Sequence, residues 1–394
     1  MNNKFEEKIK KILSKHNKYN GNELEYVLKV LDSEDLDRKE TPFVQRLEAK
    51  FCDVFGPKYA IAHNSGTSTL HTCLVAAGVG PEDEVISPAH TVIMNSFVTL
   101  HQSATTVYAD IDPETFNMCP DDLERKITKR TKAIQVVHMH GNPSDMERIM
   151  EIANRYNIPV IEDSAQCVLG KINGKMVGTF GQMASWSFET KKHLSGGEGG
   201  MVSTDNEEYA TIIRKTGGLG YKTLAAGQAL RQLLPKDFQN PHYKRHDTLG
   251  YNYRMNEVTA AIVLAQLERV EFLVERRRAV ARMYDQALSD IPFITPQKTL
   301  PGHINTYWTY TVKCEGRDWF KIYNAVKDAG GDGFYGGLSV PFKEPVMNKY
   351  KHRASGCPNS ELVQPMMMQF KANYRDLEDA ERKITILREV LRGF

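Results

Sequence analysis

A lysine followed by a glycine-rich turn is the first feature of this sequence that could do chemistry. Lys192 precedes the run HLSGGEGG, which ends at Gly200 and leads into strand-like residues 201–204. Glycines permit positive φ angles and let the backbone approach a flat ligand closely. A lysine that is buried, or that has a cationic neighbour such as Lys191, has a lowered pKa and becomes a usable amine nucleophile. On this run alone, a nucleophilic lysine and a plain turn are equally good interpretations.

An acidic residue at the end of an apolar run is the second feature. Asp163 follows residues 158–161, and Gln166 comes three positions later. An aspartate that faces a pyridine nitrogen keeps that nitrogen protonated, so that the ring can act as an electron sink. The competing interpretation is that Glu162 or Asp163 only caps a turn, and for a lone aspartate that interpretation is the better one.

Two further runs contain polar residues next to the start of an expected helix. Residues 65–69 read SGTST, and exposed N–H groups and hydroxyls at a helix start bind phosphate without a basic side chain. An ordinary Ser/Thr N-cap explains the same run. Residues 249–257 read LGYNYRMNE, a turn plus an N-cap in which Asn252 and Arg254 are equally well explained as solvated side chains.

The elements that must position these residues alternate between short apolar strands and helices. Strands are expected at residues 59–62, 84–87, 106–109, 133–137 and 159–162, with helices at 67–77 and 144–156 among them. This alternation predicts an α/β protein with a mainly parallel sheet flanked by helices, whose ligands lie at the carboxyl ends of the strands. A long connection at 218–248, one amphipathic helix at 256–288 and a smaller α+β region ending in a helix at 376–391 are expected to follow.

The composition excludes several classes of partner. The formal net charge is +2, from 51 basic and 49 acidic side chains, so no whole-protein attraction to nucleic acid or to a membrane is expected. The six cysteines form no CxxC pair and show no metal-type spacing, which predicts no metal site and suits a reducing cytoplasm. No apolar run is long enough for a membrane span.

Taken together and in this order, the four motifs resemble those of the DegT-type sugar aminotransferases, which are fold-type I pyridoxal-phosphate enzymes. The likeness runs from about residue 42 to about residue 288 and continues more weakly to the C-terminus. It implies a sheet of the seven-stranded type plus a smaller C-terminal α+β domain. The implied limits are a helical arm at 1–40, a large cofactor-binding domain at 41–265 and a small domain at 266–394.

The resemblance also implies a role for each motif. Lys192, rather than Lys191, would carry pyridoxal phosphate as a Schiff base, and Asp163 would pair with the pyridine nitrogen. These two are the implied catalytic residues, and the resemblance implies no metal. Asn252 would reach the phosphate in the partner subunit's site, so the family's homodimer has shared active sites. The other implied cofactor-binding residues are Gly66 and Thr67 on the phosphate, Ser187 on the phosphate, Gln166 against the cofactor and the residue at the ring-stacking position, here Val92.

Three positions depart from the family pattern. Val92 stands where an aromatic residue usually stacks on the pyridine ring, so stacking is weaker or comes from His90. Glu189 adds a carboxylate near the lysine with no clear role. The connection at 218–248 carries a basic run, 242–246, that would bind a diphosphate or, as the plainer interpretation, form a solvated face.

The function that the resemblance implies is ping-pong transamination. An amino acid, by family habit glutamate, would give its amino group to the cofactor, leaving pyridoxamine phosphate to aminate a nucleotide-linked keto-sugar in the cytoplasm. Three alternatives stay open: a pyridoxamine-phosphate-dependent sugar dehydratase of the same fold, a keto-inositol aminotransferase, and a cofactor-binding paralogue without turnover. The dehydratases replace the lysine with histidine, so Lys192 favours transamination.

Overall fold

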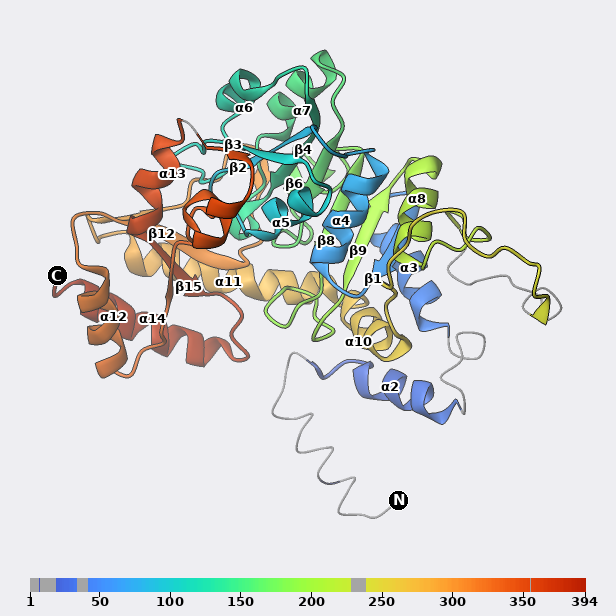
Figure 1. Cartoon of the computed structure of the whole chain (residues 1–394). Helices are drawn as coiled ribbons and strands as arrows, with labels where there is room; N and C mark the ends of the chain where they lie inside the picture. The colour runs from blue at the N-terminus through green and yellow to red at the C-terminus, as the bar shows by residue number, and fades with distance from the viewer. Residues whose placement is uncertain (1–6, 8–18, 34–41, 228–238, 355) are drawn as a thin grey trace.

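An eight-stranded sheet forms the centre of the molecule (Figure 1). The computed structural model describes residues 7, 19–33, 42–227, 239–354 and 356–394. The strands lie in the order β1-β9-β8-β5-β4-β2-β3-β14. Their bounds are β1 Tyr59–His63, β2 Glu84–Pro88, β3 Thr105–Ala109, β4 Thr131–Val137, β5 Val160–Asp163, β8 Met183–Ser187, β9 Gly200–Thr204 and β14 His352–Arg353.

The sheet is mainly parallel, as the sequence predicts. Within it, β9 alone is antiparallel to both of its neighbours, β1 and β8. The other neighbouring pairs run parallel. Seven of the strands come from the chain between Tyr59 and Thr204, and β14 adds an eighth from far along the sequence. The carboxyl ends of β2, β4, β5 and β8 therefore meet at one edge, where a ligand is expected in such a sheet.

Both faces of the sheet are buried, and strands such as β2, β5, β8 and β9 are buried along their whole length. On β8, Met183 packs with α4 Gly66–Ala76 and α8 Glu207–Gly217, whereas Trp186 points to the opposite face. Successive residues of a strand point to opposite faces, so one apolar strand supplies both cores. The helices of the second face are α3 Phe43–Phe55, α6 Pro120–Lys126, α7 Met146–Arg155 and α10 Glu257–Leu267, while α5 Met94–His101 lies with α4 and α8.

A smaller sheet of order β10-β12-β15-β13 has its own core, as predicted for the C-terminal region. Its strands are β10 Ile294–Pro296, β12 Thr309–Cys314, β13 Tyr335–Gly336 and β15 Met367–Lys371. The helices near it are α11 Val270–Leu288, α12 Trp319–Asp328, α13 Pro358–Val363 and α14 Leu377–Leu391. A third small sheet joins β11 His303–Ile304 to the hairpin of β6 Lys171–Ile172 and β7 Lys175–Met176. The predicted fold class is thus confirmed, and the predicted domain limits stay predictions.

The single helix expected at 256–288 is wrong, because the chain breaks between α10 and α11. Arg269 has the non-helical angles φ −131° and ψ 29°. Glu268 accepts hydrogen bonds from Asn22 and Tyr26, and Arg269 pairs with Glu23 at 2.8 Å. All three partners belong to α2 Glu23–Asp32 or its N-cap. At the break between α10 and α11, both of these adjacent side chains reach the same neighbouring helix or its N-cap.

The remaining expectations concern the N-terminal region and the connection at 218–248. Of the helical arm predicted at 1–40, α2 is described, while residues 1–6, 8–18 and 34–40 lie outside the described residues. Residues 228–238 of the connection also lie outside them. Within the described ranges, no helix combines the length and apolarity needed to cross a bilayer. Nor do the described residues gather three or more His, Cys, Asp or Glu side chains as a metal site.

Candidate active site

The start of α4 and the end of β8 form one side of the candidate site. Ser65 caps α4 and exchanges two hydrogen bonds with Ser68, so the N–H groups of Gly66 and Thr67 head the helix. A Cβ added at Gly66 would lie 2.8 Å from the Ser187 Cβ and 3.2 Å from its Oγ. Glycine is therefore required for this close approach. The result is two N–H groups and a hydroxyl in one place, which is the composition of an anion site.

Asp163 lies at the carboxyl end of β5 and is 5% exposed. One carboxylate oxygen accepts a hydrogen bond from Asn95 Nδ2 at 3.1 Å, and the other accepts from the Ala165 N–H at 3.1 Å. Burial raises the pKa of Asp163, while these two donors and the charge of Lys192 oppose the rise. The carboxylate is thus held in one orientation with an ammonium near it.

The glycine-rich turn after β8 brings Lys192 back toward this carboxylate. The Lys192 N–H donates to the Glu189 carbonyl at 2.9 Å, and the Glu189 carboxylate accepts from the Lys191 N–H at 2.9 Å. Gly197 and Gly199 adopt φ of +89° and +130°, which a residue with a Cβ rarely takes. Glu189, whose role was open in the sequence, is part of the turn that fixes Lys192.

Lys192 and Lys191 lie in opposite environments. Lys192 is 9% exposed, whereas Lys191 is exposed and its Nζ donates to Tyr335 Oη at 3.1 Å. Burial lowers the pKa of Lys192 to about 8, with a further contribution from Arg277, against the opposing carboxylates of Asp163 and Glu189. A buried amine with this pKa is neutral in an appreciable fraction near neutral pH, as a nucleophile must be.

Trp308 and His140 lie near Lys192, and Gln166 and His90 lie beside His140. The Lys192 Nζ lies 4.4 Å from the centroid of the Trp308 ring, a cation–π contact. Gln166 is buried, and its Oε1 accepts from the His140 N–H at 2.7 Å. His90 is fully buried 5.9 Å from the His140 ring, and burial lowers the pKa of His90 to about 4.

Val92 and Asn252, two of the predicted site residues, make their hydrogen bonds with parts of the chain other than Lys192. Val92 is half-buried, and its carbonyl accepts from Asn95 at the start of α5. Asn252 lies on the surface beside Asn64, just before α4, and its Oδ1 accepts from Arg254 Nε at 3.0 Å. Asn252 therefore lies on an exposed loop near the anion site rather than in a buried pocket.

Three residues of the site have no counterpart in the sequence motifs: Asn95 on the carboxylate, Trp308 against the amine, and Arg277, whose buried guanidinium donates to backbone carbonyls of the lysine turn. Asn95 carried a weak signal, since it stands near the start of a helix after a strand. Trp308 and Arg277 come from the C-terminal third of the chain, and only the fold brings them here.

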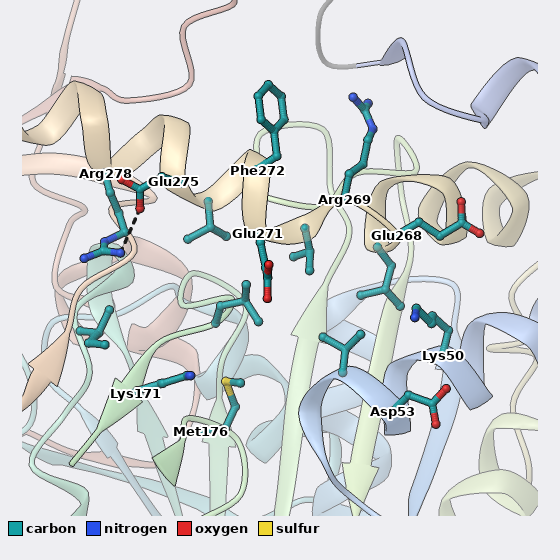
Figure 2. A pocket seen from close by; sticks show the side chains of 16 residues that line it. Lys50, Asp53, Lys171, Met176, Glu268, Arg269, Glu271, Phe272, Glu275 and Arg278 are labelled. Carbon is teal, nitrogen blue, oxygen red and sulfur yellow. Dashed lines mark hydrogen bonds and ion pairs between the residues drawn. The ribbon is translucent and has the colours of Figure 1, made fainter. Parts of the chain in front are cut away.

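A separate pocket of about 790 Å³ lies where α10 meets α11. Figure 2 shows acidic and basic side chains around it, among them the ion pair of Arg278 with Glu275 at 3.0 Å. None of the sequence-predicted site residues lines it. It is therefore distinct from the site around Lys192.

Comparisons with known proteins agree on one family. The model of the DegT/DnrJ/EryC1/StrS aminotransferase family matches residues 17–381. The chain is 39% identical over 295 residues to the GDP-perosamine synthase of Caulobacter vibrioides, covering 74% of each protein. It is 37% identical over 292 residues to the GDP-perosamine synthase of Escherichia coli O157:H7, covering 74% of this chain and 75% of that protein. The sugar aminotransferase CalS13 from Micromonospora echinospora superposes with a TM-score of 0.82 at 26% identity, covering 94% of this chain and 96% of that one.

Proposed function

The chain belongs to the DegT/DnrJ/EryC1/StrS aminotransferase family, and on that premise we propose that it transfers an amino group from an amino acid to a nucleotide-linked keto-sugar. The observation that carries the proposal within the chain is the buried pair of Lys192 and Asp163 beside an anion site. The dehydratase, keto-inositol and non-catalytic alternatives are not favoured, because the amine is present and the relatives are sugar-nucleotide and sugar enzymes by name.

The family depends on pyridoxal and pyridoxamine phosphate, and the residues of this chain fit that cofactor. The backbone of Gly66 and Thr67 with the hydroxyl of Ser187 would hold the phosphate. The oriented carboxylate of Asp163 would face the pyridine nitrogen, and Lys192 would hold the aldehyde carbon. Gln166 would lie against the cofactor with its amide fixed by the His140 N–H.

Each residue then has one task in a ping-pong reaction. Pyridoxal phosphate, when bound, supplies the electron sink for charge that develops at the donor's Cα. The freed Lys192 amine would accept the proton from that Cα and deliver it to the C4′ carbon of the cofactor. Asp163 would keep the ring nitrogen protonated, and the Trp308 ring, 4.4 Å from Lys192 Nζ, would bound one side of the space open to the amine. Glutamate is the proposed donor.

The proposed acceptor is a keto-sugar linked to GDP. Support comes from the two GDP-perosamine synthases, which match three quarters of their own length. The same proposal puts the enzyme in the cytoplasm, where its six free cysteines would stay reduced.

We also propose a homodimer in which Asn252 reaches the partner's phosphate site. The loop that carries Asn252 exposes two large apolar side chains, with Leu249 81% and Tyr251 38% exposed. Apolar side chains grouped on one exposed loop are typical of a surface that another chain covers. The loop lies beside Asn64 at the start of α4, so a partner docked there would stand next to the anion site.

The role of Lys192 is tested by borohydride reduction. Wild-type enzyme loaded with pyridoxal phosphate should give a fixed cofactor adduct on the peptide containing Lys192, detected by mass spectrometry. Lys192→Ala should give none and lose turnover, while the matched variant Lys191→Ala should behave as wild type. An adduct that survives in Lys192→Ala would disprove the assignment.

The acceptor is tested with a panel of nucleotide-linked keto-deoxy-sugars. Enzyme preloaded with amino groups by glutamate should regain its initial absorbance spectrum fastest with a GDP-linked ketone. Equal or faster recovery with UDP- or dTDP-linked ketones would contradict the GDP assignment and leave the transamination itself intact.

Hybrid dimers test the shared site. Asn252→Ala and Lys192→Ala variants should each be impaired, and mixing them after mild dissociation should restore up to about a quarter of the wild-type activity, since one site in a mixed dimer is then intact. Absence of any recovery, with mixed dimers verified by mass, would refute the proposed placement of Asn252.

A further inference from the structure

A buried arginine lies directly behind the lysine turn, and none of the described acidic residues pairs with it. Arg277, in the middle of α11, is 4% exposed, and burial lowers its pKa to about 9. No ion pair involves it in the described part of the chain. A buried guanidinium without a carboxylate is expensive, so its hydrogen bonds must replace the water it has lost.

Those hydrogen bonds all go to carbonyl oxygens around the candidate nucleophile. Nη2 donates to the carbonyls of Lys191 at 3.0 Å and Lys192 at 3.1 Å, and Nη1 donates to the carbonyl of Trp308 at 2.7 Å. The planar fork of a guanidinium fixes the directions of such bonds, which an ammonium does not. One side chain therefore holds two segments that are more than a hundred residues apart in sequence.

Trp308 completes the arrangement. Its ring Nε1 donates to the Lys191 carbonyl at 3.1 Å, so that carbonyl accepts from both Trp308 and Arg277. The face of the same ring lies 4.4 Å from Lys192 Nζ. Arg277 thus fixes the backbone of Lys192 from behind and, through Trp308, the surface against which its amine lies.

We infer that Arg277 is a positioning residue for Lys192, acting through the carbonyls of Lys191, Lys192 and Trp308. The inference rests on the role proposed above for Lys192. The Lys192 amine must move between the cofactor and the Cα atom of the donor. The backbone of Lys192 must therefore be fixed, because small misplacements of reacting atoms lower the rate by large factors. The positive charge of Arg277 also favours the neutral amine, and it is one of the groups that lower the pKa of Lys192.

The neighbouring arginine offers a matched control. Arg276 also donates to backbone carbonyls, but to those of Tyr374 and Arg375 rather than to those of Lys191, Lys192 and Trp308. Arg276→Gln therefore removes a charge one position away and leaves the three bonds of Arg277 intact. Arg277→Lys keeps the charge and loses the fork, and Arg277→Gln loses both.

The test uses full-length enzyme with bound pyridoxal phosphate and follows its absorbance against pH, together with kcat, KM and Tm. For Arg277→Gln we expect the midpoint of the absorbance change to rise by about one pH unit. The kcat should fall about 10- to 100-fold, with the donor KM within about twofold. Arg277→Lys should keep the wild-type midpoint and still lose kcat, and Arg276→Gln should keep both.

Two outcomes would overturn the inference. One is a lowered Tm in Arg277→Gln with wild-type midpoint and kcat, which is what a merely structural residue would give. If Arg277→Gln does not fold, two other variants decide the question. Trp308→Phe keeps a ring and removes the hydrogen bond to the Lys191 carbonyl. A wild-type kcat in both Arg277→Lys and Trp308→Phe would then overturn the inference. Absence of a borohydride adduct on Lys192 in the wild-type enzyme would instead refute the proposed function.

Discussion

Replacing Lys192 with methionine removes a buried amine while keeping most of the side-chain volume. The pKa of Lys192 is lowered from 10.5 to about 8 in the folded chain. Below about pH 8 the amine is protonated in both the folded and the unfolded chain, and the folded chain bears the cost of the buried charge. Lowering the pKa from 10.5 to about 8 makes that cost about 3 kcal/mol, since one pKa unit corresponds to about 1.4 kcal/mol. Between about pH 8 and pH 10.5 the unfolded chain binds more protons, so wild-type stability rises with pH.

The measurement is urea unfolding of the cofactor-free full-length chain at a series of pH values. Lys192→Met should have a larger free energy of unfolding than wild type near pH 7. This difference between the two proteins should decrease by about 3 kcal/mol by about pH 11. Lys191→Met removes an exposed amine, so its difference from wild type should stay within about 0.5 kcal/mol. In an Asp163→Asn background the carboxylate that raises the pKa of Lys192 is absent. The pH range over which wild-type stability rises should therefore begin at lower pH. A difference that does not change with pH for Lys192→Met would refute the reasoning.

Two further predictions concern the anion site at Gly66 and Ser187 and the buried ion pair of Arg214 with Glu48. Gly66→Ala should weaken pyridoxal phosphate binding at least tenfold by equilibrium dialysis, because its Cβ would lie 2.8 Å from that of Ser187, whereas Gly80→Ala, with open space around it, should bind normally. Equal cofactor affinities of Gly66→Ala and Gly80→Ala would show that phosphate binding does not depend on the close contact between Gly66 and Ser187. Arg214→Met should cost about 3–5 kcal/mol in urea unfolding, because it strands the buried carboxylate of Glu48, which Arg214 contacts with two bonds of 3.0 and 3.1 Å. Adding Glu48→Gln should recover a large part of that loss, and no recovery would contradict the reasoning.

Local patterns are sufficient to predict most strands of the large sheet and several of its helices, but not β8 or β14. The apolar runs predicted at 84–87 and 159–162 are β2 and β5 to within a residue at each end, because buried parallel strands are apolar on both faces. The helix predicted at 67–77 is α4, since the serine N-cap signals its start. The spacing of the family motif favours Lys192 over Lys191, and the two lysines differ in burial, but the Schiff-base role of Lys192 stays a prediction.

What the sequence did not predict depends on contacts between distant segments. The break at Arg269 lies where Glu268 and Arg269 both bond to α2, some 240 residues earlier in the sequence. Arg277 reads in the sequence as one of three consecutive arginines on an amphipathic helix, and nothing local marks it as the one that turns inward. Two-residue strands such as β14 carry no periodicity from which they could be predicted.

The short strand β14 has a consequence for how the chain can be divided. It covers the outer edge of β3, and Arg353 secures it by bonding Glu84 at 3.2 Å. A fragment that ended before β14 would leave β3 as an open edge of apolar and threonine residues, whose free N–H and C=O groups can recruit the same edge of another molecule. Such fragments would self-associate even if the large sheet formed correctly. The C-terminal region therefore protects the large sheet from aggregation, and the two regions should be expressed together.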